Sequence, residues 1–135
     1  MTRLSSSFVR DRQLIIVEAE VVGPRGRTTD ARLVLDTGAA ATTLTPQVIE
    51  KIGHSPRDGY RKARVHTATG EEHGYWLRVA KFTVLDVTTP NFALTVFPLG
   101  QQDIDGLVGM NFLRHFNFEV RPEERLIHLE LIEKR

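Results

Sequence analysis

One carboxylate follows an apolar run in the first third of the chain. Residues 33–35 are Leu, Val and Leu, and Asp36 comes directly after them. A run of β-forming residues that is apolar on both faces predicts a strand buried on both sides. A carboxylate at the end of such a strand is costly to bury unless it is hydrogen-bonded, paired or protonated. Asp36 therefore indicates either chemistry or a strong local hydrogen-bond network.

The residues after Asp36 predict a tight loop that carries the carboxylate. Thr37 has a hydroxyl that can bond nearby backbone, and Gly38 accepts positive φ and has no Cβ. Taken alone, the tripeptide also fits an ordinary β-turn in which the aspartate caps backbone amides. The tripeptide by itself leaves a catalytic role and a structural role open.

A second segment, residues 105–113, repeats the order found around Asp36. It reads Asp-Gly-Leu-Val-Gly-Met-Asn-Phe-Leu, an apolar strand end with a glycine and then a helical stretch. Two matched segments, far apart and in this order, indicate a particular fold more specifically than either segment alone. They indicate an approximate internal duplication in which only the first half carries the aspartate.

Both segments resemble those of a known family. Leu35-Asp36-Thr37-Gly38-Ala39 is similar to the active-site signature of aspartic proteases, and Thr42-Thr43-Leu44 fits the retropepsin branch. Residues 105–113 resemble the element that crosses behind the active loop in retropepsin-like proteases of the bacterial type. The resemblance extends over residues 17–131. It implies an all-β, closed barrel-like acid-protease fold of one lobe, with two short helices.

The resemblance also implies an activity that needs two chains. The 135 residues form one domain of the size of a single lobe, and they hold one aspartate motif. We therefore expect a homodimeric aspartic endopeptidase in which two Asp36 carboxylates share a proton and activate a water against a peptide bond. In this mechanism Thr37 braces the two loops, Gly38 and Ala39 complete the active-site loop, and no metal or organic cofactor is needed.

Two other functions stay open. The chain could be a catalytically inactive dimerisation or peptide-binding module with the same fold, although Asp36, Thr37 and Gly38 are all present. It could also be an enzyme that processes a longer precursor of its own.

Residues 65–77 predict two extended arms around a polar tip formed by Ala68, Thr69 and Gly70. The resemblance implies that this hairpin is the flap that closes over a bound peptide; a plain surface hairpin is the alternative. It further implies an apolar subsite wall made of Leu107 and Val108.

The chain departs from the viral members of the family at two positions. Viral retropepsins often have an aspartate after the motif alanine and an arginine after the second-motif glycine, and these pair. Here Ala40 and Met110 occupy those places. Because apolar residues can replace a buried ion pair at little cost, we expect the fold to persist and the grip on substrate main chain near Ala40 to change.

Composition excludes several other classes. The net charge is +1 with both signs interspersed, there is no cysteine, and the five histidines lack the spacing of a zinc site. We expect no nucleic-acid partner, no membrane segment and no metal, and a cytoplasmic location. The basic residues Arg57, Arg61, Lys62 and Arg64 are expected to lie on a solvated loop.

The remaining elements are predicted from periodicity and turn residues. Residues 1–12 are expected to be an N-terminal arm, either frayed or ordered against a partner, and residues 13–135 the protease domain. Strands are predicted at 13–22, 28–36, 75–87, 92–97, 118–120 and 126–132, with a break at 88–91. Helices are predicted from Thr45-Pro46 to Gly53 and over 110–116, and 54–64 is expected to be the least ordered segment.

Overall fold

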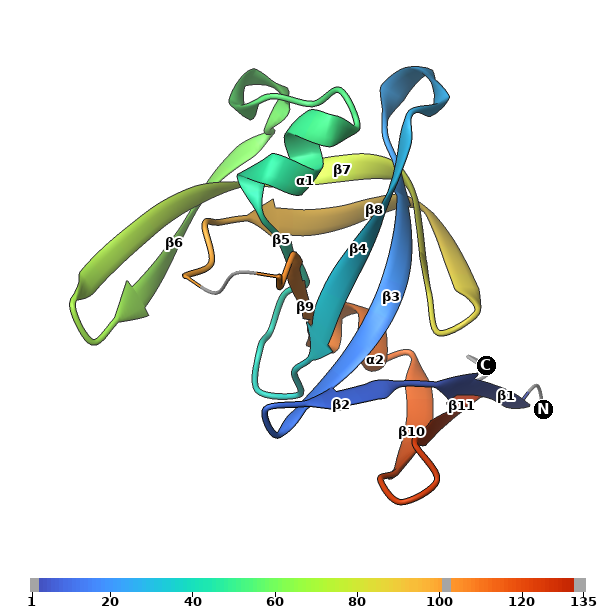
Figure 1. Cartoon of the computed structure of the whole chain (residues 1–135). Helices are drawn as coiled ribbons and strands as arrows, with labels where there is room; N and C mark the ends of the chain where they lie inside the picture. Colours follow the sequence, from blue (N-terminus) through green and yellow to red (C-terminus); the bar gives the residue numbers. More distant parts are fainter. Residues whose placement is uncertain (1–2, 101–102, 133–135) are drawn as a thin grey trace.

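The structure, a computed structural model, describes residues 3–100 and 103–132 (Figure 1). Its strands are β1 (Arg3–Ser7), β2 (Val9–Asp11), β3 (Leu14–Val22), β4 (Thr28–Leu35), β5 (Thr43–Leu44), β6 (Arg61–Thr67), β7 (Gly70–Val84), β8 (Val87–Val96), β9 (Gly106–Val108), β10 (Phe116–Arg121) and β11 (Leu126–Leu131). The α-helices are α1 (Pro46–Lys51) and α2 (Met110–Leu113), and two 3-10 turns are η1 (Pro24–Gly26) and η2 (Pro56–Asp58).

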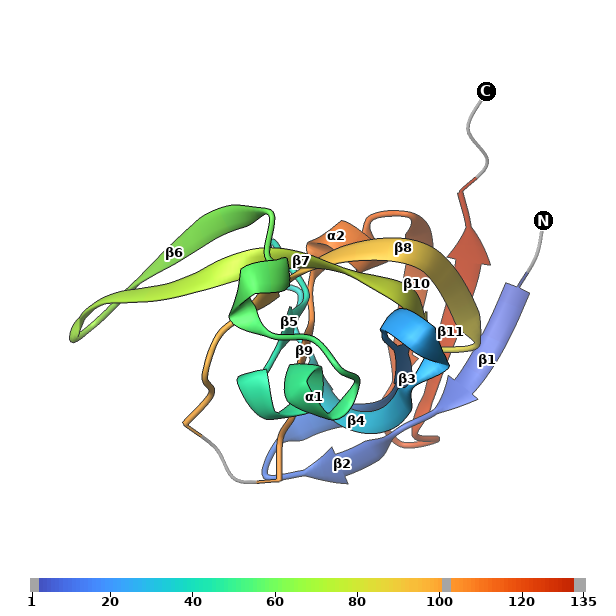
Figure 2. The same cartoon turned by 90° about the horizontal axis from the view of Figure 1, so that it is seen from above.

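Six strands close into a barrel. The order β3-β4-β9-β5-β8-β7 is continuous in the larger sheet, and a further pairing of β3 with β7 joins its ends (Figures 1 and 2). The period-2 pattern of β3 suits this arrangement, since Val17, Ala19 and Val21 are buried while Glu18 and Glu20 are exposed. The expectation of an all-β, closed barrel-like fold with two short helices is confirmed.

The two matched segments meet in this barrel. β4 and β9 pair in parallel, with Leu33 opposite Gly106 and Leu35 opposite Val108. β9 also pairs with β5, and a Cβ built on Gly106 would lie 2.1 Å from the carbonyl oxygen of Thr43. A glycine is required there because the neighbouring backbone occupies the space of any side chain.

An aromatic cluster fixes α2 against the barrel. The rings of Phe82 and Phe92 stack at 4.8 Å between centroids, and Phe112 of α2 meets both of them edge-on at 6.1 and 6.3 Å. Phe82 and Phe112 are 0% and 2% exposed, so this contact belongs to the core. The second segment is thus held against β7 and β8.

A second, three-stranded sheet has the order β1-β11-β10, and the predicted C-terminal hairpin is present in it. The N-terminal residues 3–11 are not a frayed tail. β1 pairs with β11 and β2 with β3, and the N–H of buried Phe8 donates to the carbonyl of Arg125 at 3.0 Å. The described part of the expected arm is therefore ordered against strands of its own chain.

The expectation for residues 54–64 is wrong. Ser55 and Asp58 form a capping box around η2, and Asp58 also contacts His54 at 3.0 Å. β6 then begins at Arg61, within the segment that composition predicted to be least ordered. Local hydrogen bonds satisfy the polar residues here, whereas composition alone counted them as unstructured.

Two predicted boundaries are also wrong. The chain reverses at Leu85 and Asp86, which have φ of 52° and 63°, and not at 88–91. β8 runs through Pro90, and it tolerates proline because β5 pairs with β8 only at Thr95 and Val96. The second helix ends at Leu113 instead of 116, because Phe116 starts β10.

Among the described residues, no helix combines the length and apolarity that a membrane crossing requires.

Candidate active site

Asp36 lies at the end of β4, in a turn that holds its carboxylate. Its N–H donates to the carbonyl of Val108 at 2.9 Å, and its Oδ1 accepts the N–H of Gly38 at 2.9 Å. The N–H of Ala39 closes the turn on the carbonyl of Asp36 at 3.3 Å. No described residue donates to the second carboxylate oxygen, so that oxygen can bind a water or a second carboxyl group.

The carboxylate is less buried than the sequence predicted. Leu33 is 0% exposed, but Val34, Leu35 and Asp36 are half-buried in the single chain. The strand is therefore fully buried on one face only, since Ala31 and Leu33 are buried whereas Val34 and Asp36 on the other face are half-buried. Asp36 is accessible in one chain.

Backbone bonds fasten the loop after Asp36 to the second segment. The N–H of Met110 donates to the carbonyl of Ala39 at 2.7 Å, and that of Asn111 to the carbonyl of Ala40 at 3.0 Å. A Cβ built on Gly109 would lie 2.5 Å from the carbonyl oxygen of Ala41. Glycine at position 109 thus allows the two segments to cross in contact.

A buried polar network supports the loop that follows Asp36. Oδ1 of Asn111 accepts both the N–H and the hydroxyl of Thr42 at 2.8 Å, while its Nδ2 donates to the carbonyl of Ala93 at 2.9 Å. The hydroxyl of Thr42 in turn accepts the N–H of Gly109 at 3.1 Å. Thr42 is 0% exposed, so these groups depend on one another for partners.

Thr95 extends this network into β8. Its N–H donates to the carbonyl of Thr42 at 2.9 Å, and its hydroxyl lies 2.7 Å from that of Thr43. Sequence reasoning used Thr42 and Thr43 only as a family match and gave Asn111 no role of its own. The available signal was the occurrence of hydroxyl and amide residues inside otherwise apolar segments.

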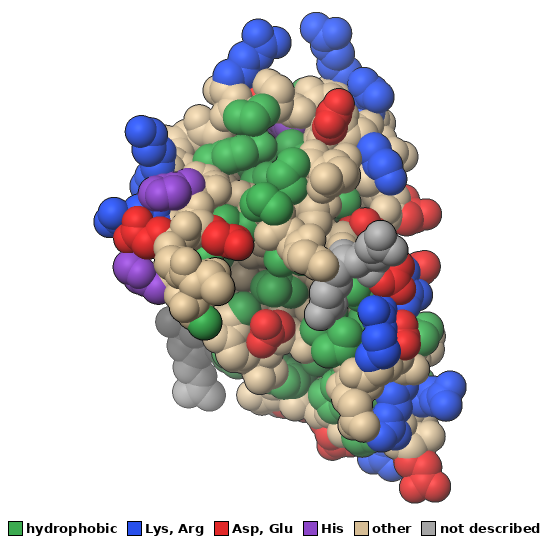
Figure 3. Space-filling view, turned by 60° about the vertical axis from the view of Figure 1, so that its left-hand side comes forward, with side chains coloured by type: hydrophobic (Ala, Val, Ile, Leu, Met, Phe, Trp, Pro, Cys, Tyr) green, Lys and Arg blue, Asp and Glu red, His purple; other side chains and the backbone are tan. Residues whose placement is uncertain are grey.

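A cleft of about 630 Å³ opens between the loop after Asp36 and the β6–β7 hairpin. Figure 3 turns the hairpin side forward: hydrophobic side chains occupy the middle of this face, and Lys and Arg side chains lie at its margins. The cleft is lined by Gly38, Ala39, Ala40, Ala41, Thr43, Arg61, Lys62, Ala63, Arg64, Val65, Glu72, Trp76, Thr95, Phe97, Pro98, Leu99 and Leu107.

The structure separates the two residues expected to form an apolar subsite wall. Leu107 is half-buried and lines the cleft. Val108 is 0% exposed, belongs to the core and does not line the cleft, so its assignment to the wall is wrong. The reason is the alternation of β9, which points successive side chains to opposite faces. Thr37 is exposed, directly after Asp36.

The hairpin predicted at 65–77 is present and longer than expected. β6 and β7 pair from Arg61 opposite Trp76 to Thr67 opposite Gly70, and the hairpin projects from the barrel in both ribbon views (Figures 1 and 2). Its tip residues Ala68, Thr69 and Gly70 are exposed, and Gly70 has a φ of 133°. Position and exposure suit a movable cover, and a role as flap stays a prediction.

Two polar groups near the base of this hairpin, Asp58 of η2 and Tyr75 of β7, have shifted pKa values. The N–H of Ser55, followed by His54, lowers the pKa of Asp58 below its ordinary value. Burial, with a smaller contribution from Asp58, raises the pKa of Tyr75. The hairpin also packs closely on β8, since a Cβ on Gly74 would lie 2.1 Å from the carbonyl oxygen of Val96.

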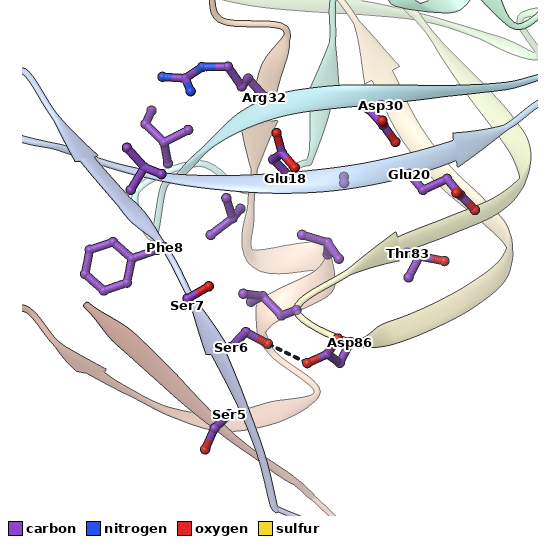
Figure 4. Close-up of a pocket in the computed structure, with 16 residues that line it drawn as sticks. Ser5, Ser6, Ser7, Phe8, Glu18, Glu20, Asp30, Arg32, Thr83 and Asp86 are labelled. Atoms are coloured by element: carbon purple, nitrogen blue, oxygen red, sulfur yellow. Dashed lines mark hydrogen bonds between the residues drawn. The ribbon is translucent and has the colours of Figure 1, made fainter. Parts of the chain in front are cut away.

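A second cavity of about 610 Å³ lies away from the Asp36 loop, between β1, β3, β4 and the β7–β8 turn (Figure 4). Its rim carries Glu18, Glu20, Asp30 and Asp86, and the hydroxyl of Ser6 donates to Asp86 at 3.0 Å. Glu20 of β3 is opposite Asp30 of β4, and both side chains are exposed to solvent. Throughout the described residues, no three His, Cys, Asp or Glu side chains gather in a way that could hold a metal ion.

Comparisons with known proteins agree with this geometry. The model of the family described as "gag-polyprotein putative aspartyl protease" matches residues 26–115, a span that holds the Asp36 loop, the hairpin and the second segment. The crystal structure of a retropepsin-like aspartic protease from Rickettsia conorii matches with a TM-score of 0.70 and 23% identity. That match covers 96% of this chain and 99% of the Rickettsia chain, and at this identity it establishes the fold alone. A search of curated proteins found no match.

Proposed function

Since the chain belongs to the gag-polyprotein aspartyl protease family, we propose that it is a homodimeric aspartic endopeptidase whose active site holds Asp36 from each of two chains. The observation that carries the proposal is the Asp36 turn itself. One carboxylate oxygen is held by the N–H of Gly38, and the other has no donor among the described residues. A single chain supplies one such half-buried carboxylate at the end of β4, which is half of an aspartic dyad.

The dyad chemistry follows from the repulsion of like charges. Two carboxylates in contact do not both ionise cheaply, so the pair retains one proton. The charged member takes a proton from a water as that water attacks the scissile carbonyl, and the neutral member donates to the carbonyl oxygen. The N–H of Gly38 keeps the carboxylate of Asp36 oriented for this exchange.

The other residues around the cleft have matching roles in the proposal. Thr37, exposed beside Asp36, braces the loop of one chain against that of its partner. Gly38 has no side chain and Ala39 a small one, so the backbone of a substrate can approach this wall of the cleft. Leu107 supplies an apolar contact. The β6–β7 hairpin closes over the bound peptide, and closure of this kind excludes bulk solvent from the cleft while the attacking water stays between the two carboxyl groups.

The test is to replace Asp36 and then to mix subunits. Asn has the size and shape of Asp but does not exchange the proton, so Asp36→Asn should abolish peptide cleavage and leave the fold intact. Asp30→Asn, at an exposed position of the same strand, is the matched control and should keep wild-type activity. Cleavage by a rigorously purified Asp36→Asn protein would refute the assignment.

Mixing tests the two-chain site directly. Wild type and Asp36→Asn are combined in equal amounts under conditions of subunit exchange. Random pairing places about half of the wild-type chains in dead heterodimers, so activity per wild-type chain should fall to about half. Activity should also fall faster than linearly on dilution. A mixture that keeps the full activity of its wild-type chains, and loses none of it beyond proportion on dilution, would contradict a shared site.

A further inference from the structure

The inner face of the β6–β7 hairpin is defined by strand alternation. Arg61 is opposite Trp76, Ala63 opposite Gly74 and Val65 opposite Glu72, and alternate positions of paired strands share one face. All of these residues except Gly74 line the cleft. Lys62 and Arg64 border the cleft as well, but alternation sends their side chains to the other face. Of the basic residues, Arg61 is therefore the one whose side chain lies on the cleft side.

The guanidinium of Arg61 is held in place by an aromatic ring. Its Cζ lies 5.2 Å from the centroid of the Trp76 ring, a cation–π arrangement that restricts the side chain without neutralising its charge. Trp76 is half-buried at the base of the hairpin. Arg61 is thus positioned in advance, with less conformational entropy to lose when it binds a ligand than a free surface arginine would have.

Arg61 has no counter-ion among the described residues, unlike Arg12 and Arg121. Arg12 pairs with Asp103 at 3.0 Å, and Arg121 pairs with Glu119 at 3.0 Å and with Glu124. The described lining of the cleft holds one carboxylate, that of Glu72. It lies four ladder positions from Arg61, or about 13 Å along the strand. At this backbone separation the two side chains form no ion pair, so Glu72 does not hold the guanidinium of Arg61.

The surroundings of this cation are mostly apolar. Val65, Phe97, Leu99 and Leu107 line the same cleft, beside the loop that follows Asp36. An apolar cleft with one oriented guanidinium at its edge fits a chain segment that has an acidic side chain near apolar ones. A guanidinium binds a carboxylate through two parallel N–H donors, which adds geometric selectivity to charge attraction.

We propose that Arg61, seated on Trp76, is a specificity-determining residue that binds an Asp or Glu side chain of the peptide in the cleft. This inference rests on the proposed function, because it takes the occupant of the cleft to be a peptide substrate. The preferred substrate places an acidic residue at the base of the hairpin and apolar residues along Leu99 and Leu107.

The experiment uses pairs of apolar peptides that differ only by Glu or Gln at successive positions. Binding is measured by fluorescence anisotropy on the full-length Asp36→Asn protein, and cleavage is measured with the wild-type protein. At one position we expect about a fivefold to tenfold preference for Glu at low salt, decreasing as salt rises. The preference for Glu over Gln should disappear in Arg61→Gln. Arg61→Glu should instead prefer a peptide with Lys at the same position.

Arg78 offers a matched control. Its Cζ lies 5.3 Å from the ring centroid of Tyr60, so it is also stacked on an aromatic ring, but it donates to the carbonyl of Asn91 and does not line the cleft. Arg78→Gln should keep the wild-type ratio of Glu to Gln binding. Loss of the preference in Arg78→Gln to the same extent as in Arg61→Gln would overturn the inference, because the effect would then be one of net charge.

The two proposals fail in different ways. Cleavage of Glu and Gln peptides at equal rates, with equal binding, would overturn the role of Arg61 and leave the protease function standing. Binding that depends on Arg61, without cleavage by wild type, would support the role of Arg61 and refute the protease function. Failure of every peptide to bind would overturn the inference.

Discussion

Removal of the Asn111 side chain should strongly destabilise the loop that carries Asp36. This amide joins three segments, since it accepts two hydrogen bonds from Thr42 and donates one to the carbonyl of Ala93. Asn111→Ala removes all three bonds at once. Thr42 directly follows the stretch 38–41 that lines the cleft, so the loss acts on the wall of the proposed active site.

The magnitude follows from what is left without a partner. Thr42 is 0% exposed, so water does not replace the lost bonds to its N–H and hydroxyl. Each buried polar group without a partner costs about 1–3 kcal/mol, whereas the half-buried residue Ala93 can recover a water on its carbonyl. We therefore expect Asn111→Ala to lower the free energy of unfolding by roughly 2–6 kcal/mol, about 1–3 kcal/mol for each of the two groups of Thr42.

The assay is urea unfolding at one fixed protein concentration, since dissociation of a dimer would contribute to the apparent stability. The slope of free energy against urea should be unchanged, which shows that stability and not compactness has altered. Asn117→Ala is the control, because Asn117 is exposed and makes one bond, to Glu130 at 3.2 Å. The free energy of unfolding of Asn117→Ala should lie within about 0.5 kcal/mol of that of wild type. Equal losses in the two variants would refute the proposed role of the network.

Two further predictions concern the hairpin and its base. The folded-state pKa of Asp58 is lowered from its ordinary value of 3.8, chiefly by the N–H of Ser55, so the stability it contributes is present above that value and is lost as pH falls below it. Wild type should therefore have a higher free energy of unfolding than Asp58→Asn at neutral pH, and this difference, measured by urea unfolding, should vanish in acid. A difference that stays constant with pH would contradict this prediction. Amide protons of 65–77 should exchange faster than those of 33–35 in the free protein and slow down with a peptide-like inhibitor. Equal protection with and without inhibitor would argue against a flap.

The sequence predicts the Asp36 loop because its signals are local, and it predicts the barrel through the family resemblance that the two segments carry. An apolar strand followed by Asp36-Thr37-Gly38 specifies its own turn through contacts within a few positions of the chain. Gly106 and Gly109 mark two places where the second segment touches the backbone of residues 41–43, and their presence in the sequence is part of that resemblance. The hairpin at 65–77 is predicted for the same reason, since strand-forming arms flank a tip that contains glycine.

The missed features depend on contacts between distant segments. Nothing near Thr42 in sequence indicates that its partner is Asn111, and an amide at the start of a short helix has many ordinary explanations. The burial of Asp36 is lower than the sequence predicts because a run of apolar residues does not reveal that one face of the strand is only half-buried. The reversal at Leu85-Asp86 was missed because leucine is not a turn former, while the Pro90-Asn91 pair gives a stronger local signal inside a continuous strand.

The absence of the charged pair of viral retropepsins can be understood from these contacts. Backbone bonds connect Met110 with Ala39 and Asn111 with Ala40, and they do not depend on side-chain charge. Met110 packs against the core, so an apolar side chain is suited to its position. The join between the two segments is therefore complete without an ion pair. The loop has no side-chain charge at position 40, and under the proposed role of Arg61 the cleft offers its charged contact from the hairpin instead. Under that proposal, opening of the hairpin would withdraw Arg61 from the substrate together with the cover.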